Sequence, residues 1–347
     1  MNKAMFLISF LIALVVSLAI TSLMIKAGVS DIPLDRSSHK HATPTCGGVA
    51  FIASIGVVVV SYYFQGGFAN AISVPLLALI VSVAIMGLMD DIIIAGSTAK
   101  FIIMAFMAGA SVAVIGPVDS LALGIGEIQV PIWLGYICGA IWISTAMNLI
   151  NFIDGANGMQ ALNMGISFAG LLVFSVLMNA NGAALLSLAM LAGYLGFAPF
   201  NIREHARIFS GDVGAVTAGY VYAIAVLILA KESGNSSAIY IGPLLILPTL
   251  TDTVLTVVRR VQSGNNIFKA HNTHLFQKMI RIRGAHLPVS FKYAGVTALN
   301  VLIVFCAAQL NFVRNPAFVA VAIIVAIIIY QILHRRAKIL DTAPSIN

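Results

Sequence analysis

Charged residues are scarce in this sequence, and that scarcity excludes an ordinary soluble protein. Asp, Glu, Lys and Arg make up 9% of the 347 residues, whereas hydrophobic residues make up 60%. Soluble proteins carry about 25% charged residues. Apolar runs of about 18 to 25 residues recur along the chain and leave no room for a sizeable soluble domain. We therefore predict an all-α fold, a polytopic membrane helical bundle forming one integral membrane domain over residues 1–347.

Cysteine is scarce as well. Cys46, Cys138 and Cys306 are far apart and lack C-x-x-C spacing, which excludes a disulfide framework and a zinc site built on cysteine. We interpret them as packing residues. The N-terminal apolar run has no A-x-A cleavage site after it, which favours a first membrane span over a signal peptide.

Hydropathy and run length predict about eleven membrane spans. They are Ala4 to Ile25, Gly47 to Phe64, Val74 to Met89, Ala99 to Ile115, Pro131 to Leu149, Ala161 to Met178, Ala183 to Phe200, Val213 to Ala230, Ile239 to Val258, Phe291 to Leu310, and Ala317 to Leu333. When the spans alternate across the membrane, all but three of the 19 Lys and Arg residues fall on one side. The positive-inside rule makes that side the cytoplasm, with the N-terminus outside and the C-terminus inside. We therefore interpret the net charge of +7 as a signal of how the chain is oriented in the membrane, and we expect no nucleic-acid partner.

Acidic residues and histidines follow the same asymmetry. Only Asp119, Glu127 and Glu232 among the 12 acidic residues fall outside, and all seven histidines fall inside. This concentration predicts a functional site at the cytoplasmic boundary of the membrane. A transporter would place ionisable groups at mid-membrane and show paired broken helices in two halves. A transporter with a polar cytoplasmic mouth is the alternative from another class.

The segment between the fifth and sixth spans is rich in Asn, Asp and Gly. Asn148, Asn151 and Asp154 recur every three residues, close enough to helical spacing to share one face. Gly155 and Gly158 then end the helix and let a ligand approach the backbone. A carboxylate beside hydrocarbon is costly and usually pairs, binds an ion or lines a wet site. A polar helix cap is the simpler alternative, although Asp is unfavourable at the negative end of the helix dipole.

Two adjacent carboxylates, Asp90 and Asp91, stand where the third span leaves the membrane. They repel each other unless a cation or ligand holds them, and Mg²⁺ combines carboxylates with water and phosphate oxygens. A structural pair bridging to loop arginines is the alternative. Lys100 follows in the first turn of the next span, after Ser97 and Thr98 as candidate N-caps.

Two further inner segments carry candidate residues. A basic, proline-broken loop contains Arg36 and His39 and ends in a Gly-Gly pair, which would let a phosphate approach backbone N–H groups; a solvated connector is the alternative. The loop before the eighth span contains Phe209 and Asp212. This Asp lies between glycines and is a candidate metal or phosphate residue, with a capped helix start as the alternative.

The longest inner loop contains His271 and His274. Three residues apart, they can lie on one helix face and hydrogen-bond an anionic ligand. A zinc site would need a third partner, and no Cys or Glu lies nearby. A basic helix on anionic lipid is the alternative. We interpret Asp252, in the ninth span, as a satisfied polar group within the membrane.

Taken in order, these motifs resemble the polyprenyl-phosphate N-acetylhexosamine-1-phosphate transferases of glycosyltransferase family 4, which include the enzyme that makes lipid I of peptidoglycan. The resemblance runs from Arg36 to His274. It implies transfer of a HexNAc-1-phosphate from a UDP-N-acetylhexosamine to polyprenyl (undecaprenyl) phosphate, with release of UMP. It also implies Mg²⁺ as cofactor, with Mn²⁺ as a substitute, and the bacterial inner membrane as location, among membrane lipids. A homodimer is left open.

The resemblance also implies roles for individual residues. The catalytic residues would be Asp90, Asp91 and Asp212, with Asp212 and Asp91 binding the metal. The substrate-binding residues would be Asn148, Asn151, Asp154, Asn157, Phe209, His271, His274, Arg36, His39 and Lys100. Within that set, Asn151 and Asp154 would contact the nucleotide sugar, and Phe209 would stack on uracil. The two histidines would contact the diphosphate or the sugar.

The sequence departs from the family pattern at several positions. Asn157 stands where many members have a second Asp, residues 203–205 replace a proline-containing approach, and Ala215 replaces a hydroxyl. The loop at His271 lacks the consecutive His triplet of the lipid I enzymes, which favours a simple HexNAc, as in O-antigen or capsule synthesis. Phospho-MurNAc-pentapeptide transferase is the alternative. An intramembrane aspartyl protease is disfavoured, because Gly211-Asp212 lacks its preceding Gly-x and the partner Tyr-Asp is missing.

Overall fold

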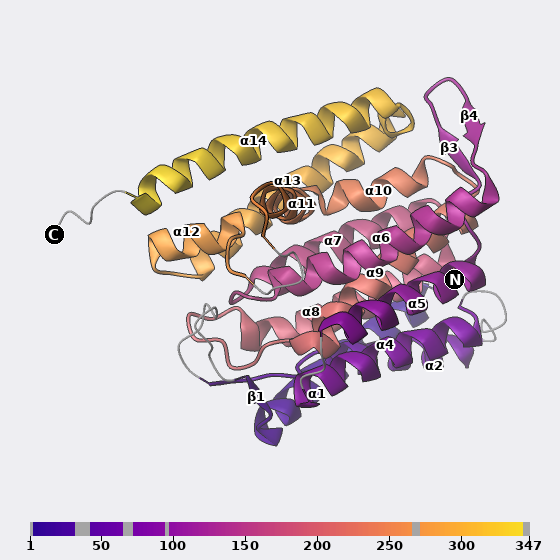
Figure 1. The fold of residues 1–347 in the computed structure, drawn as a ribbon. Coiled ribbons are helices and arrows are strands. Elements are labelled where there is room, and N and C mark those ends of the chain that lie inside the picture. Colours follow the sequence, from indigo (N-terminus) through magenta and orange to yellow (C-terminus); the bar gives the residue numbers. More distant parts are fainter. Residues whose placement is uncertain (1–2, 32–41, 65–71, 94–96, 266–270, 343–347) are drawn as a thin grey trace.

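The protein is a bundle of helices in a computed structural model that describes residues 3–31, 42–64, 72–93, 97–265 and 271–342 (Figure 1). Its elements are α1 (Lys3–Ala27), β1 (Ser30–Asp31), β2 (Thr43–Pro44), α2 (Val49–Tyr63), α4 (Val74–Ile93), α5 (Ser97–Ile115), β3 (Ser120–Ala122), β4 (Glu127–Gln129), α6 (Ile132–Ile153), α7 (Met159–Leu177), α8 (Asn181–Asn201), α9 (Gly211–Ser233), α10 (Ala238–Leu245), α11 (Leu247–Gln262), α12 (Leu275–Arg283), α13 (Leu287–Gln309), η1 (Phe312–Arg314) and α14 (Pro316–Thr342). The start of α1 and the end of α14 lie at opposite ends of the bundle.

The helices confirm the predicted all-α membrane bundle. Within the described ranges, nine helices are long and apolar enough to cross a membrane, a tenth candidate is a bent pair, and α2 is a shorter apolar helix. Each predicted span therefore has a helical counterpart. Peripheral helices such as α14 expose many large apolar side chains, as expected of a surface that faces lipid. The predicted orientation of the termini stays a prediction.

The ninth predicted span, Ile239 to Val258, is wrong as a continuous helix. The chain forms α10 and α11 instead, which meet at an angle of 73°. Pro248 lies in the first turn of α11 and has no backbone N–H to continue the hydrogen bonds of α10. The bend turns α11 away from the bundle axis and places its basic end beside α12.

Helix α9 is the centre of the bundle, and 94% of its membrane window is buried. It packs mainly on α4 and α6, and small residues make the close approach possible. A Cβ at Gly87 of α4 would lie 2.6 Å from the carbonyl oxygen of Asp212 at the start of α9. A Cβ at Gly219 would overlap the backbone of α6 at Ala146. The first turn of α9 is thereby held against the ends of its neighbours.

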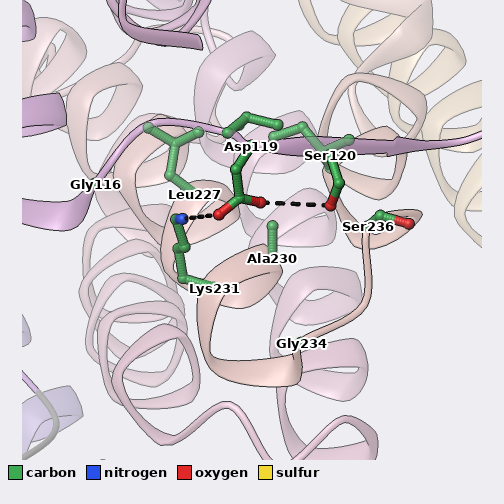
Figure 2. A pocket seen from close by; sticks show the side chains of 10 residues that line it. Gly116, Asp119, Ser120, Leu227, Ala230, Lys231, Gly234 and Ser236 are labelled. Atoms are coloured by element: carbon green, nitrogen blue, oxygen red, sulfur yellow. Dashed lines mark hydrogen bonds and ion pairs between the residues drawn. The ribbon is translucent and has the colours of Figure 1, made fainter. Parts of the chain in front are cut away.

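Among the described residues, two small antiparallel sheets, β1–β2 and β3–β4, were absent from the sequence prediction and lie near opposite ends of the bundle (Figure 1). The β3–β4 hairpin is fastened to the end of α9, where Lys231 Nζ donates to Asp119 Oδ2 at 2.8 Å. Figure 2 shows this contact beside a small cavity of about 140 Å³. The Lys231 hydrogen bond holds the pKa of Asp119 below its ordinary value. We interpret this contact as structural, because it joins two elements that the chain connects only through α6, α7 and α8.

Candidate functional site

The carboxylate of Asp91 binds the N-terminus of α9. Its Oδ1 accepts the backbone N–H of Asp212 at 2.8 Å, and its Oδ2 accepts that of Val213 at 3.0 Å. The first N–H groups of a helix have no partner within the helix and attract negative charge. Asp91, in the last turn of α4, thus fastens the end of α4 to the start of α9.

Lys100 joins the other two predicted catalytic carboxylates. Its Nζ lies 2.7 Å from Asp90 Oδ2 and also forms an ion pair with Asp212 Oδ2. All three side chains are only 15 to 22% exposed. Since Lys100 lies in the first turn of α5, as predicted, three helix ends meet at one ammonium group. Oxygens of Asp90 and Asp212 therefore converge on a single cationic point.

The glycines around Asp212 allow this crowding. Gly211 has a positive φ of 68°, and a Cβ there would lie 2.5 Å from Asp91 Oδ2. The Gly-Gly pair of the basic loop, Gly47 and Gly48, donates its N–H groups to the carbonyls of Phe209 and Ser210 at 3.0 and 2.8 Å. The expectation that these N–H groups receive a phosphate is therefore wrong, because tertiary contacts already use them.

Asp154 joins the same end of the molecule. It is the C-cap residue of α6, and its Oδ2 accepts a hydrogen bond from Ser210 Oγ at 2.9 Å. Asn148 and Asn151 lie in the last turns of α6, and the Asn148 amide donates to the carbonyl of Ser144 at 2.8 Å. The Asn-Asp segment and the Asp212 loop therefore form one continuous set of contacts.

Asn157 has a structural role in addition to any role in binding. Its side-chain amide donates to the carbonyls of Arg203 and Glu204 at 3.1 and 2.6 Å, and its own carbonyl accepts Ser290 Oγ at 2.7 Å. The side chain is buried. Asn157 thus connects the segment 203–205, where the sequence departs from the family pattern, to the start of α7.

The two histidines of the long loop stack on each other. Their ring centroids are 5.0 Å apart, and Phe152 of α6 lies 6.2 Å from His271 and 5.5 Å from His274. The expectation that both lie on one helix face is wrong, because α12 begins only at Leu275 and His274 is its N-cap residue. Ring stacking, absent from the sequence pattern, brings the histidines to the end of α6.

Burial lowers the pKa of both imidazoles, which favours their neutral form at pH 7. Burial, with a smaller effect of His274 and Arg260, lowers the pKa of His271 to about 4. Burial likewise lowers the pKa of His274, against the opposing attraction of Asp252. A neutral imidazole still donates one N–H, so the pair can hydrogen-bond an anion without adding charge.

Asp252 holds the histidine loop in place. Its carboxylate accepts the backbone N–H groups of Leu275 and Phe276 at 2.9 and 3.2 Å and the hydroxyl of Tyr293 at 2.8 Å. Only 2% of the residue is exposed. The interpretation of Asp252 as a satisfied polar group is confirmed, and its partners are the N-terminus of α12 and a tyrosine of α13.

The remaining candidates divide into three groups. Phe209 is mostly buried, with its N–H bonded to the Pro44 carbonyl at 2.8 Å. Cys46 is buried with its Sγ 3.8 Å from Asp91 Oδ2, and burial, together with that carboxylate, raises the pKa of the thiol to about 12. Cys138 and Cys306 are exposed, so the prediction that they are packing residues is wrong for these two. Arg36 and His39 lie outside the described residues.

Sequence reasoning missed Ser210, Phe152 and Arg260 as parts of this site. Ser210 connects Asp154 to the Asp212 loop, Phe152 carries the histidine rings, and Arg260 affects the pKa of both histidines. Ser210 and Phe152 each lie beside a residue that the sequence did single out, but their own contacts join segments far apart in the chain. A hydroxyl directly before Gly-Asp was the one available signal.

The described carboxylates do not form a complete metal site by themselves. Among the described residues, no group of three or more His, Cys, Asp or Glu side chains is arranged to hold a metal ion by itself. The convergence of Asp90 and Asp212 on Lys100 nevertheless offers oxygen donors from two carboxylates, which is the donor set that Mg²⁺ takes when phosphate and water complete its shell. These oxygens are of the donor type that a metal bound together with phosphate requires, and Lys100 Nζ lies between them.

Comparison with known proteins supports a membrane enzyme. The model of the family "Glycosyl transferase family 4" matches residues 72–230, a range that includes Asp90, Asp91, Asp154 and Asp212. A probable undecaprenyl-phosphate N-acetylglucosaminyl 1-phosphate transferase of Bacillus subtilis is 28% identical over 293 residues, covering 81% of this chain and 78% of the relative. A phospho-N-acetylmuramoyl-pentapeptide-transferase of Staphylococcus aureus is also 28% identical, covering 76% of this chain and 88% of the relative.

Proposed function

Because this chain belongs to glycosyl transferase family 4, we propose that it transfers a HexNAc-1-phosphate from a UDP-N-acetylhexosamine to undecaprenyl phosphate. An oxygen of the lipid phosphate attacks the sugar-bearing phosphorus. The P–O bond between that phosphorus and UMP breaks, and UMP leaves with the bonding electrons. The product is a polyprenyl diphospho-sugar, which begins a cell-envelope glycan at the cytoplasmic face of the bacterial inner membrane.

The observation that carries this proposal is the meeting of Asp90, Asp91, Lys100 and Asp212 at the ends of three helices. Joining two phosphate anions depends on positioning and on compensation of negative charge. The site lies where apolar helices end, so a lipid phosphate reaches it from the membrane. By their names, both relatives transfer a hexosamine derivative together with a phosphate group, which agrees with this chemistry.

The residues divide the work as follows. Asp90 and Asp212 face the cationic point at Lys100, and with it they position the lipid phosphate and the donor diphosphate. Asp91 sets the start of α9 through its backbone bonds while retaining lone pairs for a metal. Asp212 and Asp91 are the proposed ligands of Mg²⁺ or Mn²⁺. When bound, the metal neutralises charge on the phosphates.

The donor contacts the neighbouring residues in this proposal. Asn148, Asn151, Asp154 and Asn157 bind the nucleotide sugar, and Phe209 stacks on uracil after a side-chain rearrangement, since its ring is mostly buried. The neutral pair of His271 and His274 donates N–H groups to the diphosphate or the sugar. Arg36 and His39 are the proposed contacts from the basic loop.

The second candidate function uses UDP-MurNAc-pentapeptide as donor. It is favoured by the Staphylococcus aureus relative, which matches this chain as closely in identity as the Bacillus subtilis one does. The absence of a consecutive His triplet at residues 271–274 favours the smaller donor. The two candidates share the carboxylate site and differ only in the sugar that it accepts.

A donor panel tests both candidates. Purified protein in detergent with Mg²⁺ and undecaprenyl phosphate is given UDP-GlcNAc, UDP-GalNAc or UDP-MurNAc-pentapeptide, and UMP release is measured. We expect UMP with one of the first two, dependent on the lipid phosphate and abolished in Asp212→Asn. UMP release with the pentapeptide alone would support the second candidate, and no release with any donor would contradict both.

A further inference from the structure

A basic cavity of about 370 Å³ lies between α11, α12 and α14, on the side of α11 that faces α14. Its wall includes Arg259, Arg260, Lys278, His334 and Lys338. None of its lining residues, all of them described, is acidic. Like charges gathered around one cavity repel one another, and an anion inside would relieve that repulsion.

Neutral groups contact two of the cations of this cavity, Arg259 and Lys278. The Arg259 guanidinium lies 4.7 Å from the ring centroid of Tyr330, and it donates to the Tyr330 hydroxyl at 3.1 Å and to Gln331 Oε1 at 2.6 Å. Lys278 Nζ lies 3.5 Å from His334 Nε2. These contacts fix the directions of the side chains without cancelling the charge of Arg259, so the cavity is prepared for an anion.

The cavity opens beside a surface that faces lipid. α14 forms one edge of the molecule (Figure 1) and exposes Ile328, Ile329 and Ile332 in the turns that lead to His334. α11 exposes Val258 and Val261 next to Arg259 and Arg260. An amphiphile can therefore place its headgroup in the cavity and its chains along these apolar faces. Basic pockets between membrane helices bind anionic headgroups in this way.

We propose that this cavity binds the phosphodiester headgroup of an anionic membrane phospholipid. The proposal goes beyond the transfer reaction, since the lipid is not consumed and the cavity contains none of the carboxylates that meet at Lys100. The cavity still borders the candidate site, because the hydroxyl oxygen of its wall residue Thr273 lies 3.0 Å from His271 Nδ1. A bound headgroup holds the loop that carries the two histidines.

The test compares two double variants of equal charge. Lys278→Gln with Lys338→Gln removes two cations from the cavity wall. Arg335→Gln with Arg336→Gln removes two exposed cations of α14 that do not line it. Each delipidated protein is titrated with phosphatidylglycerol or phosphatidylcholine in mixed micelles. Binding is followed by native mass spectrometry and by the shift of the unfolding temperature.

We expect phosphatidylglycerol to bind wild type and the Arg335/Arg336 variant equally, and the Lys278/Lys338 variant at least tenfold more weakly. The single variant Lys338→Gln, at the exposed end of α14, gives an intermediate loss and replaces the double variant if that fails to fold. Equal losses in both double variants, or equal binding of phosphatidylcholine, would overturn the proposal. Displacement by millimolar inorganic phosphate would assign the cavity to a soluble phosphate compound. Displacement by undecaprenyl phosphate would assign the cavity to the binding of the lipid substrate. Displacement by either compound would overturn the proposal of a phospholipid site.

Discussion

The side chain of Asp91 accepts the backbone N–H of Asp212 at 2.8 Å across 121 positions of sequence. One predicted catalytic residue therefore sets the backbone of another. The Asp212 side chain is left free to turn toward Lys100, and Asp90 approaches the same lysine from the other side. Neighbouring carboxylates in sequence thus have different partners: Asp91 binds backbone N–H groups of α9, and Asp90 pairs with Lys100.

The two adjacent carboxylates should respond differently to amide substitution. In Asp91→Asn, one acceptor of a backbone N–H becomes an NH₂ donor, which costs about 1 to 3 kcal/mol for an unsatisfied buried group. Thermal unfolding should shift downward. Asp90→Asn weakens an ion pair with Lys100 but removes no acceptor from a helix N-terminus, and should lower the unfolding temperature less than Asp91→Asn does. Both should lower kcat by about 10² or more. Equal unfolding temperatures for the two variants would refute this division.

Asp212→Asn and Asp252→Asn form a matched pair. Asp212→Asn should be inactive and not rescued by modest extra Mg²⁺, because the proposed function makes this carboxylate a metal ligand at the reacting phosphates. Asp252→Asn should unfold at lower temperature, since Asp252 holds the start of α12. Its turnover per folded molecule should stay within about tenfold, as for a group without a transition-state contact. An inactive Asp252→Asn beside a near wild-type Asp212→Asn would require abandoning this site.

Two glycines of one region provide a test of close packing. A Cβ at Gly48 would overlap the backbone of Gly214, whereas a Cβ at Gly56 of α2 meets nothing within 4 Å. Gly48→Ala should therefore separate α2 from α9 and reduce both the unfolding temperature and the yield of folded protein. Gly56→Ala should be neutral or slightly stabilising, because Ala favours a helix over Gly by about 1 kcal/mol. The measurements are thermal unfolding and size-exclusion chromatography in detergent, and a tolerated Gly48→Ala would contradict the packing.

The low pKa of His271 predicts a loss of stability in acid. Its value of about 4 lies below the 6.5 of an ordinary histidine. Between these values the unfolded chain binds a proton that the folded protein excludes, so stability falls as the pH drops from about 6.5 toward 4. His271→Gln should reduce the fall in unfolding temperature between pH 7 and pH 4.5. Asp119 does not belong to this loop, so its titration contributes equally to the pH dependence of both proteins. An identical pH profile for wild type and variant would disprove this origin of the acid response.

Cysteine labelling checks the predicted orientation. In a background with the three native cysteines replaced, Asn235→Cys should react with an impermeant maleimide applied to intact cells. Thr43→Cys and Ser263→Cys should react only after the membrane is opened. The exposed Cys138 and Cys306 make the cysteine-free background necessary. Outside labelling of Ser263→Cys would reverse the side assigned to the basic cavity and to the end of α11.

The sequence predicts those features of the fold that depend on long local patterns. Apolar runs locate every span, and the one-sided distribution of charge anticipates that Asp90, Asp91, Asp154 and Asp212 gather at one end of the bundle. The glycines flanking Asp212 likewise anticipate a helix start. These signals are local, because lipid demands continuous apolar helices and makes each intramembrane charge costly.

Contacts between distant segments could not be predicted in the same way. The N–H groups of Gly47 and Gly48 donate to carbonyls that lie more than 160 residues later in the chain. No local sequence pattern distinguishes such a tertiary contact from a phosphate-binding loop. The histidine pair is stacked against Phe152 from α6, which helical spacing alone cannot show. Pro248 is a local signal for the break before α11, but neither the 73° angle nor the contacts of α11 with α12 and α14 can be derived from it.

Because Asp91 and its backbone partners are far apart in sequence, their hydrogen bonds can form only late in biosynthesis. The Asp90–Lys100 pair spans 10 positions and can form once α4 and α5 have left the ribosome. The N–H groups that satisfy Asp91 belong to residues made 121 and 122 positions later. Until α9 inserts, the nascent chain carries a carboxylate at the membrane boundary that must remain hydrated or protonated. Truncated chains that end before α9 should therefore be poor at leaving the insertion machinery.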